Sequence, residues 1–296
     1  MAKHLGLTDV SDAALIRAAR AAMAGALAGE FPEDPVIGPD LSRALSVLGS
    51  TVKRHGGLIE LGIAGALIAS DRYVVLTNVT LPVTKAAAQL LDAKNSDQAL
   101  AKIKLSADSE AEGIVNVDLV VVDPDAKWAG AYEIKRGNGA TEHGKRRPIM
   151  RKLAAARLVL ESYVRQAGYG TMERVTSGVI DYYGASGFDK NLALSREHLD
   201  VHFDVPVVAT VEAMTAALHE ELLIALPQLF RPFLASLPEA NRGDAKPATD
   251  RRRAAAGNPD AALQSLMVPP AGPGRRVSCS DRVSEPSLAG APRAAH

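Results

Sequence analysis

The sequence has a single cysteine, no net charge and no long apolar run. Cys279 is the only cysteine among 296 residues, so the chain can form neither an intrachain disulfide nor a metal site built from several cysteines. Lysine and arginine together number 34, and so do aspartate and glutamate, so an anionic partner would have to be attracted by local patches. The scarcity of cysteine suits a reducing compartment, and we predict a cytoplasmic location.

Segments that could enter a membrane are lacking as well. The N-terminal stretch carries Arg17 and Arg20, so it has no uninterrupted apolar region of the kind found in a signal peptide. The longest run with only one charge covers residues 56–70 and is too short to span a bilayer. We therefore predict no membrane partner. The composition, 47% hydrophobic and 23% charged, is typical of a globular protein.

Composition divides the chain into three parts. Residues 1–39 are expected to hold an N-terminal helix over 10–29 and a linker, where EFPEDPVIGPD contains three prolines. Residues 40–240 are predicted to form one domain. Residues 241–296 contain seven of the 17 prolines, no aromatic residue, and nine lysines and arginines against five acidic residues. We predict that this basic Pro/Ala-rich tail is disordered, because it cannot bury enough surface to offset its ordering entropy.

Hydrophobic patterning predicts a mixed α/β order for the central domain. We expect helices from the low 40s to about 54 and at 57–70, 147–167 and 210–226, strands at 72–83, 114–122, 130–136 and 174–184, and a polar, helix-prone insertion at about 85–105.

The stretch VDLVVVDPDAKWAGAYEIKRGNG, residues 117–139, puts charged residues where a core is expected. Asp118 lies in a continuous apolar run, which is typical of a strand covered on both faces. Side chains alternate along a strand, so Glu133 and Lys135 should share one face and Ile134 should point to the other. If the two strands pair antiparallel, Asp118 and Glu133 converge. Two converging carboxylates repel each other unless a divalent cation lies between them.

Two further features flank this stretch. Glu60 is the only charged residue between His55 and Asp71, on a helix that is otherwise apolar nearly all round, so we expect it to be paired or functional. From Lys135 to Arg165, nine basic residues outnumber two acidic ones. A helix N-terminus with arginines beside it suits phosphate oxygens. The residues expected to contact a nucleic-acid backbone are Arg136, Lys145, Arg146, Arg147 and Arg151.

The elements follow the order of a helix with glutamate, a strand, a strand with aspartate, a strand with Glu-x-Lys, a helix and a further strand. This order resembles the PD-(D/E)xK nuclease superfamily. The resemblance covers about residues 50–185, and Val117 stands where the name-giving proline often stands. It implies an α/β, restriction-endonuclease-like fold, with a central mixed sheet flanked by helices and an αβββαβ core.

The resemblance also implies a function, which is metal-dependent hydrolysis of DNA phosphodiester bonds in a repair, restriction or mobile-element context. Asp118, Glu133 and the backbone carbonyl of Ile134 would bind Mg²⁺, with Mn²⁺ as a substitute. Lys135 would position the attacking water and stabilise developing negative charge. Glu60 matches the helix carboxylate of the family, which supports these ligands or binds a second metal ion.

Several alternatives stay open. The same fold could hold DNA or a protein partner without cutting, and the charges could instead form internal salt bridges. The intact Asp118, Glu133 and Lys135 favour an enzyme, because a degenerate copy usually loses one of them. A homodimer is one arrangement that would cut both strands. Tyr182 and Tyr183 end a strand, where core packing is favoured over stacking on a base. His198 and His202 have a spacing that can bind zinc, without the other residues of a metalloprotease.

Overall fold

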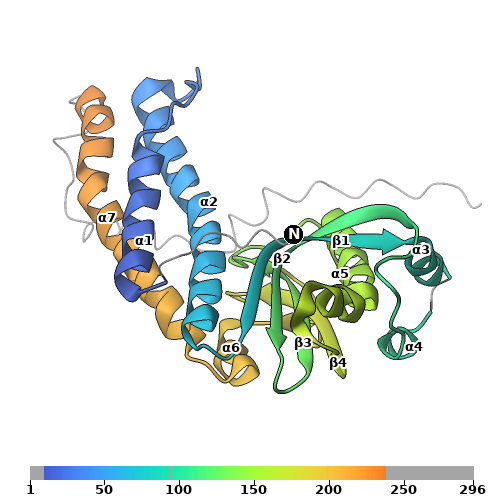
Figure 1. The fold of residues 1–296 in the computed structure, drawn as a ribbon. Helices are drawn as coiled ribbons and strands as arrows, with labels where there is room; N and C mark the ends of the chain where they lie inside the picture. The colour runs from blue at the N-terminus through green and yellow to red at the C-terminus, as the bar shows by residue number, and fades with distance from the viewer. Residues whose placement is uncertain (1–9, 94, 238–296) are drawn as a thin grey trace, which may run out of the picture. The chain divides into compact units, whose positions relative to one another are not determined.

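The structure, a computed structural model, describes residues 10–93 and 95–237. These residues form an α/β fold in which helices flank a five-stranded mixed sheet (Figure 1). The prediction of an α/β domain with a mixed central sheet is confirmed. The tail that we predict to be disordered, 241–296, lies outside the described residues.

The sheet has the strand order β1-β2-β3-β4-β5. The pairs β1–β2 and β2–β3 are antiparallel, whereas the pairs β3–β4 and β4–β5 are parallel. The strands predicted at 114–122 and 130–136 thus pair antiparallel, which was the condition for Asp118 and Glu133 to converge. The strands are β1 (Val74–Thr84), β2 (Ala111–Asp123), β3 (Trp128–Lys135), β4 (Arg174–Asp181) and β5 (Ala193–Leu194).

Helices precede, interrupt and follow these strands. Between β1 and β2, the predicted insertion forms two short helices. The short helix that directly follows β5 was not predicted. The helices are α1 (Asp12–Leu27), α2 (Gly38–Ala69), α3 (Lys85–Asp92), α4 (Asp97–Ala101), α5 (His143–Val164) with a π-helical turn at its end (Arg165–Tyr169), α6 (Arg196–Phe203) and α7 (Val207–Ser236).

Two helices are longer than predicted. The two helices expected before β1 are one helix, α2, which continues through its glycines because His55 is buried there and hydrogen-bonds to Thr215 of α7 at 2.9 Å. The predicted end of α7 near residue 226 is also wrong. Pro227 lies inside the helix, and its side chain is exposed, on the side where a helix tolerates longer hydrogen bonds.

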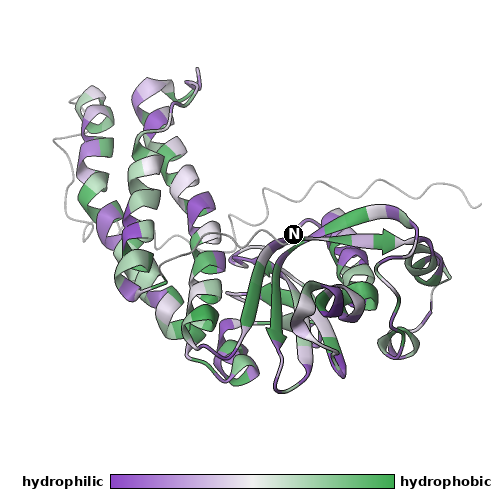
Figure 2. Cartoon of the chain, viewed as in Figure 1, coloured by the Kyte–Doolittle hydropathy of each residue, from purple (hydrophilic) through white to green (hydrophobic). Residues whose placement is uncertain are grey.

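The sheet separates two apolar clusters. One face packs against α2, α6 and α7, for example through Ile63, Phe203 and Val211. The other face packs against α5 through Leu153 and Leu160. Figure 2 shows hydrophobic residues along most of the central strands. Their burial on both sides explains why β2 is a nearly continuous apolar run.

A third apolar cluster joins α1, α2 and α7, which lie side by side in Figure 1. Leu15 and Met23 of α1 pack there with Val47 and Met214. The N-terminal helix thus shares a core with the helices that continue to the sheet. None of the helices in the two described ranges combines the length and apolar composition of a membrane span.

The strands β1 and β2 bend at the same point. Thr77 pairs with Leu119 and Val79 pairs with Val117, which leaves Asn78 and Asp118 opposite each other within the ladder. Asn78 has a left-handed backbone with φ of 51°. The alternation of side chains reverses here, because Leu119 faces the α2 side whereas Val117 faces the α5 side. At this bend, Asp118 departs from the regular alternation of side chains between the two faces of the sheet.

Candidate functional site

Asp118 lies where β2 and β3 diverge. The main-chain ladder between the two strands extends as far as the pair Leu119–Tyr132. Beyond that pair, the N–H of Ile134 donates a hydrogen bond to Asp118 Oδ2 at 2.7 Å. The aspartate side chain thus satisfies a backbone donor that would otherwise lose its partner at the divergence. This contact fixes the carboxylate beside the Glu-x-Lys segment of β3.

Glu133 is held by two lysines. It is only 5% exposed, and its Oε1 accepts a hydrogen bond from Lys135 Nζ at 2.6 Å. Its other oxygen accepts a hydrogen bond from Lys152 of α5. Ile134 packs in the cluster on the α2 side, so the predicted division of Glu133 and Ile134 between two faces is confirmed.

The sequence interpretation missed the place of Lys152 in this cluster. A signal for it existed, because Lys152 lies at helical spacing from Ile149 and Ala156 on the apolar stripe of α5. A single charge on a buried stripe is the same signal that singled out Glu60.

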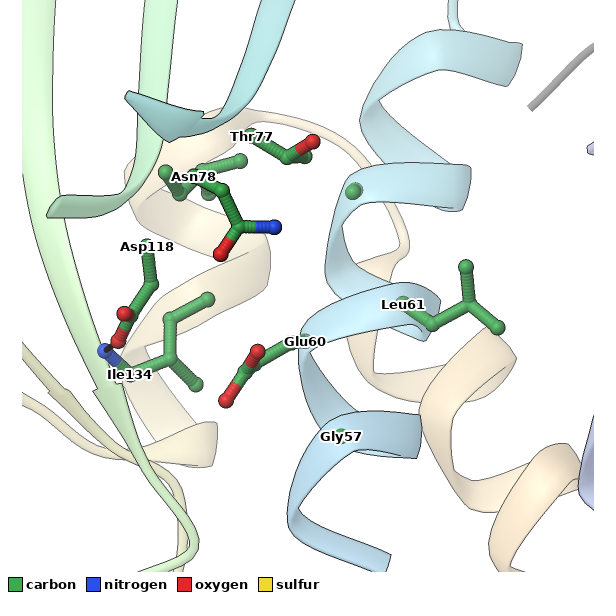
Figure 3. Close-up of a pocket in the computed structure, with 9 residues that line it drawn as sticks. Gly57, Glu60, Leu61, Thr77, Asn78, Asp118 and Ile134 are labelled. Carbon is green, nitrogen blue, oxygen red and sulfur yellow. Dashed lines mark hydrogen bonds between the residues drawn. The ribbon is translucent and has the colours of Figure 1, made fainter. Parts of the chain in front are cut away.

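Glu60 reaches the site from the opposite helix. A cavity of about 280 Å³ lies between α2 and the bend in the sheet. Figure 3 shows Glu60 extending from α2 toward Asp118 and Asn78 on the strands. Thr77 Oγ1 also belongs to the lining, and it is buried without a hydrogen-bond partner among the described residues. The cavity wall includes polar Glu60, Asn78 and Asp118 and apolar Leu61, Leu119 and Ile134.

The three carboxylates have different pKa shifts. Burial, and then the charge of Asp118, raises the pKa of Glu60 to about 7, against the opposing effect of Lys135. Burial also raises the pKa of Asp118, although the hydrogen bond from Ile134 opposes it. For Glu133, burial acts to raise the pKa, but the hydrogen bonds from Lys135 and Lys152 outweigh it, so the pKa is lowered. Glu133 is therefore the most strongly ionised of the three.

Replacing Glu60 with glutamine is expected to reduce the pH dependence of stability. Because the pKa of Glu60 rises from 4.5 to about 7 on folding, the folded protein keeps a proton that the unfolded chain releases. Its free energy of unfolding therefore falls as the pH rises through that interval. Since the side chain is partly exposed, we expect Glu60 to contribute about 1–2 kcal/mol to this fall.

Urea unfolding of the wild type and Glu60→Gln in a chelator, at about pH 5 and about pH 8, measures this contribution. The variant should lose less stability than the wild type between the two pH values. An equal loss in both proteins would contradict the electrostatic account of Glu60.

The five basic residues predicted to contact nucleic acid differ in their partners, and four of them lie on α5. Lys145 pairs with Glu142 at 3.0 Å, and Arg151 pairs with Asp92 of α3 at 2.9 Å. The other three differ in their surroundings. Arg146 donates hydrogen bonds to the carbonyls of Thr141 and Gly187, Arg147 is exposed on α5, and Arg136 donates a hydrogen bond to His55 of α2.

The donor atoms of the cluster suit a hard divalent cation. Carboxylate and carbonyl oxygens are the ligands that Mg²⁺ prefers, and the carboxylates of Glu60, Asp118 and Glu133 outnumber the ammonium groups of Lys135 and Lys152. A divalent cation would relieve the electrostatic repulsion that remains among these three carboxylates. Within residues 10–93 and 95–237, no three or more His, Cys, Asp or Glu side chains are grouped to hold a metal ion. A site would therefore rest on two carboxylates and a main-chain oxygen.

The two histidines with zinc-like spacing have other partners. His198 Nδ1 lies 2.9 Å from Ser195 Oγ, and His202 Nε2 lies 2.6 Å from the hydroxyl of Tyr132. His202 also packs against Trp128 and Phe203 in an aromatic group. Burial lowers the pKa of His202, which favours its neutral form. These contacts support a packing role for His202, whereas His198 is exposed.

Comparisons with protein-family models, with curated proteins and with solved structures find no match for this chain. The class that the fold defines is an α/β protein with a five-stranded mixed sheet flanked by helices.

Proposed function

We propose that this protein is a divalent-metal-dependent endonuclease that hydrolyses DNA phosphodiester bonds. The observation that carries the proposal is the position of Asp118 at the divergence of β2 and β3. There it contacts the Glu-x-Lys strand and shares an electrostatic environment with Glu60, Glu133 and Lys135. Buried carboxylates and a lysine gathered at such a point are costly to stability, which favours a functional reason for them.

The order of elements supports a restriction-endonuclease-like fold. The chain passes through α2, β1, β2, β3, α5 and β4, with α3 and α4 inserted between the first two strands. This is the αβββαβ order of the PD-(D/E)xK superfamily, which the chain resembles. The glutamate on the first helix, the aspartate on the second strand and the Glu-x-Lys on the third strand lie at the corresponding places.

Each residue can be given a chemical role. Asp118, Glu133 and the Ile134 carbonyl would hold Mg²⁺ or Mn²⁺, and Glu60 would support them from α2 without being a third carboxylate ligand of the same ion. The metal ion, when bound, activates water and neutralises charge on the scissile phosphate. Lys135 would hold the attacking water and stabilise negative charge that develops on the phosphate. Lys152 would fix the rotamer of Glu133 through the contact seen in the structure.

Replacing Asp118 with asparagine is expected to weaken Mn²⁺ binding about 100-fold or more, because it removes the charge of a proposed ligand. Isothermal titration calorimetry with the full chain measures the affinity. Asp125→Asn is a matched control, since Asp125 is exposed in the turn between the same two strands and should bind Mn²⁺ like the wild type. A wild type that binds neither Mg²⁺ nor Mn²⁺ would contradict the proposed function.

A nuclease-fold module that binds DNA without cutting is the second candidate. The observation that favours it is the pairing of both Glu133 oxygens with lysines, which already neutralises that carboxylate. Incubation of plasmid and single-stranded DNA with Mg²⁺ or Mn²⁺ separates the two candidates. The enzyme produces cleaved DNA, whereas the binding module retains DNA in a mobility-shift assay and leaves it intact.

A further inference from the structure

A second cavity lies next to the candidate active site. It has a volume of about 190 Å³ and is formed by α2, α7 and the segments that follow β3 and β4. Its apolar lining includes Val52, Leu218 and Leu222, and its other lining includes His55, Arg136 and Tyr183. None of these side chains has a role in the hydrolytic chemistry proposed above.

Arg136 is held in this cavity in a fixed orientation. Its Nε donates a hydrogen bond to His55 Nδ1 at 3.0 Å, so a neutral His55 carries its proton on Nε2, which contacts Thr215 Oγ1 at 2.9 Å. The guanidinium carbon lies 5.9 Å from the centre of the Tyr183 ring. Among the described residues, no carboxylate forms a salt bridge with Arg136. The fork of terminal N–H groups can therefore donate to a ligand.

The two cavities follow each other along the same pair of elements. Ile134 lines the first cavity and Arg136 lines the second, two residues further along β3 and its extension, which is about 7 Å. On α2, Glu60 and His55 are five residues apart, which is about 7.5 Å along the helix axis. A strand of DNA whose phosphate reaches Asp118 could thus place a neighbouring nucleotide at Arg136.

The lining favours a base over a phosphate. Aliphatic walls and an aromatic ring suit the flat apolar face of a nucleobase, and the arginine fork suits acceptor atoms on its edge. A phosphate would instead need several free donors, whereas the hydroxyls of Thr51 and Thr215 in the same lining already donate to main-chain carbonyls of their own helices. Of the two adjacent tyrosines, only Tyr183 is placed to contact a base, because it is half-buried and lines the cavity. Tyr182 is fully buried and donates a hydrogen bond to Glu212.

We propose that the cavity at His55, Arg136 and Tyr183 binds an unpaired base next to the scissile phosphate, so that the substrate is DNA with single-stranded or locally unpaired nucleotides. This inference rests on the proposed nuclease function and specifies its substrate class. A paired base in a duplex cannot enter the cavity without leaving the base stack.

An abasic scan tests the proposal on the full chain without cleavage. A fluorescent single strand of about 12 nucleotides is bound in EDTA, and versions of it carry one abasic site at each position in turn. We expect one position at which loss of the base weakens binding to the wild type about tenfold. Tyr183→Ala and Arg136→Lys should abolish this dependence on position, and Tyr183→Phe, which keeps the ring, should retain it.

Arg147→Ala is the control for backbone contacts, since it should weaken binding to intact and abasic strands by the same factor. A scan without any sensitive position in the wild type would overturn the proposal, and so would a sensitive position that persists in a folded Tyr183→Ala or Arg136→Lys protein. The wild type could cleave DNA in a manner that depends on Lys135 and yet show no sensitive position in the abasic scan. That result would reject only the base site and would leave the nuclease function supported.

Discussion

Replacing Lys135 with alanine is expected to lower the rate of Mg²⁺-dependent DNA cleavage about 100- to 1,000-fold. The Lys135 ammonium is partly exposed and lies 2.6 Å from Glu133 Oε1, at the divergence that holds Asp118. It is therefore placed to act on water and on phosphate oxygen beside the proposed metal ligands. Loss of a preorganised cationic donor removes stabilisation that matters most in the transition state.

Initial rates on plasmid and on single-stranded DNA measure this effect. Lys127→Ala is a matched control, because Lys127 immediately precedes the other end of β3 and pairs with Glu173 at 2.7 Å in the same manner. The control should cleave at the wild-type rate. If Lys135→Ala and Lys127→Ala cleave alike, the catalytic assignment of Lys135 is wrong.

Replacing Gly137 with alanine is expected to lower the free energy of unfolding by about 3 kcal/mol or more. Gly137 has φ of 75°, which an L-residue adopts only with strain, and a Cβ there would lie 1.8 Å from Asp181 Oδ1. Asp181 cannot move away easily. It is 3% exposed and accepts hydrogen bonds from the Ser186 N–H at 3.0 Å and hydroxyl at 2.7 Å.

The same substitution should also lower cleavage, because Gly137 follows Lys135 and Arg136 and its carbonyl accepts a hydrogen bond from Ala185 at 2.8 Å. Gly139→Ala is the matched control. A Cβ at Gly139 meets nothing within 4 Å, so its stability should stay within about 0.5 kcal/mol of the wild type. Urea unfolding measures both variants, and equal midpoints for them would contradict the steric argument.

The candidate carboxylates could be selected from the sequence because each breaks a local pattern. Asp118 interrupts an apolar strand, Glu60 is alone on an apolar helix, and Glu133 alternates with Ile134 in a strand whose neighbours are buried. These signals depend only on the periodicity of helices and strands. The same periodicity predicted the two strands on either side of the turn that joins β2 to β3.

The predicted ends of α2 and α7 were wrong, because these ends depend on packing against other parts of the fold. The helix α2 continues past the expected break because His55 is anchored by Thr215 of α7. The helix α7 continues through Pro227, which is on its exposed side. In both helices, tertiary packing outweighs the local tendency of glycine or proline to end a helix.

The sequence by itself determined which residues carry charge into the core, the alternation of Glu133 and Ile134, and the mixed α/β order of elements. Only the tertiary structure decided that Asn78 and Asp118 bend two strands together, that Lys152 reaches Glu133, and that Arg136 turns to His55. These contacts join segments far apart in the chain. A local pattern fixes the face on which a side chain lies, but its partner on another element is set by how the elements pack.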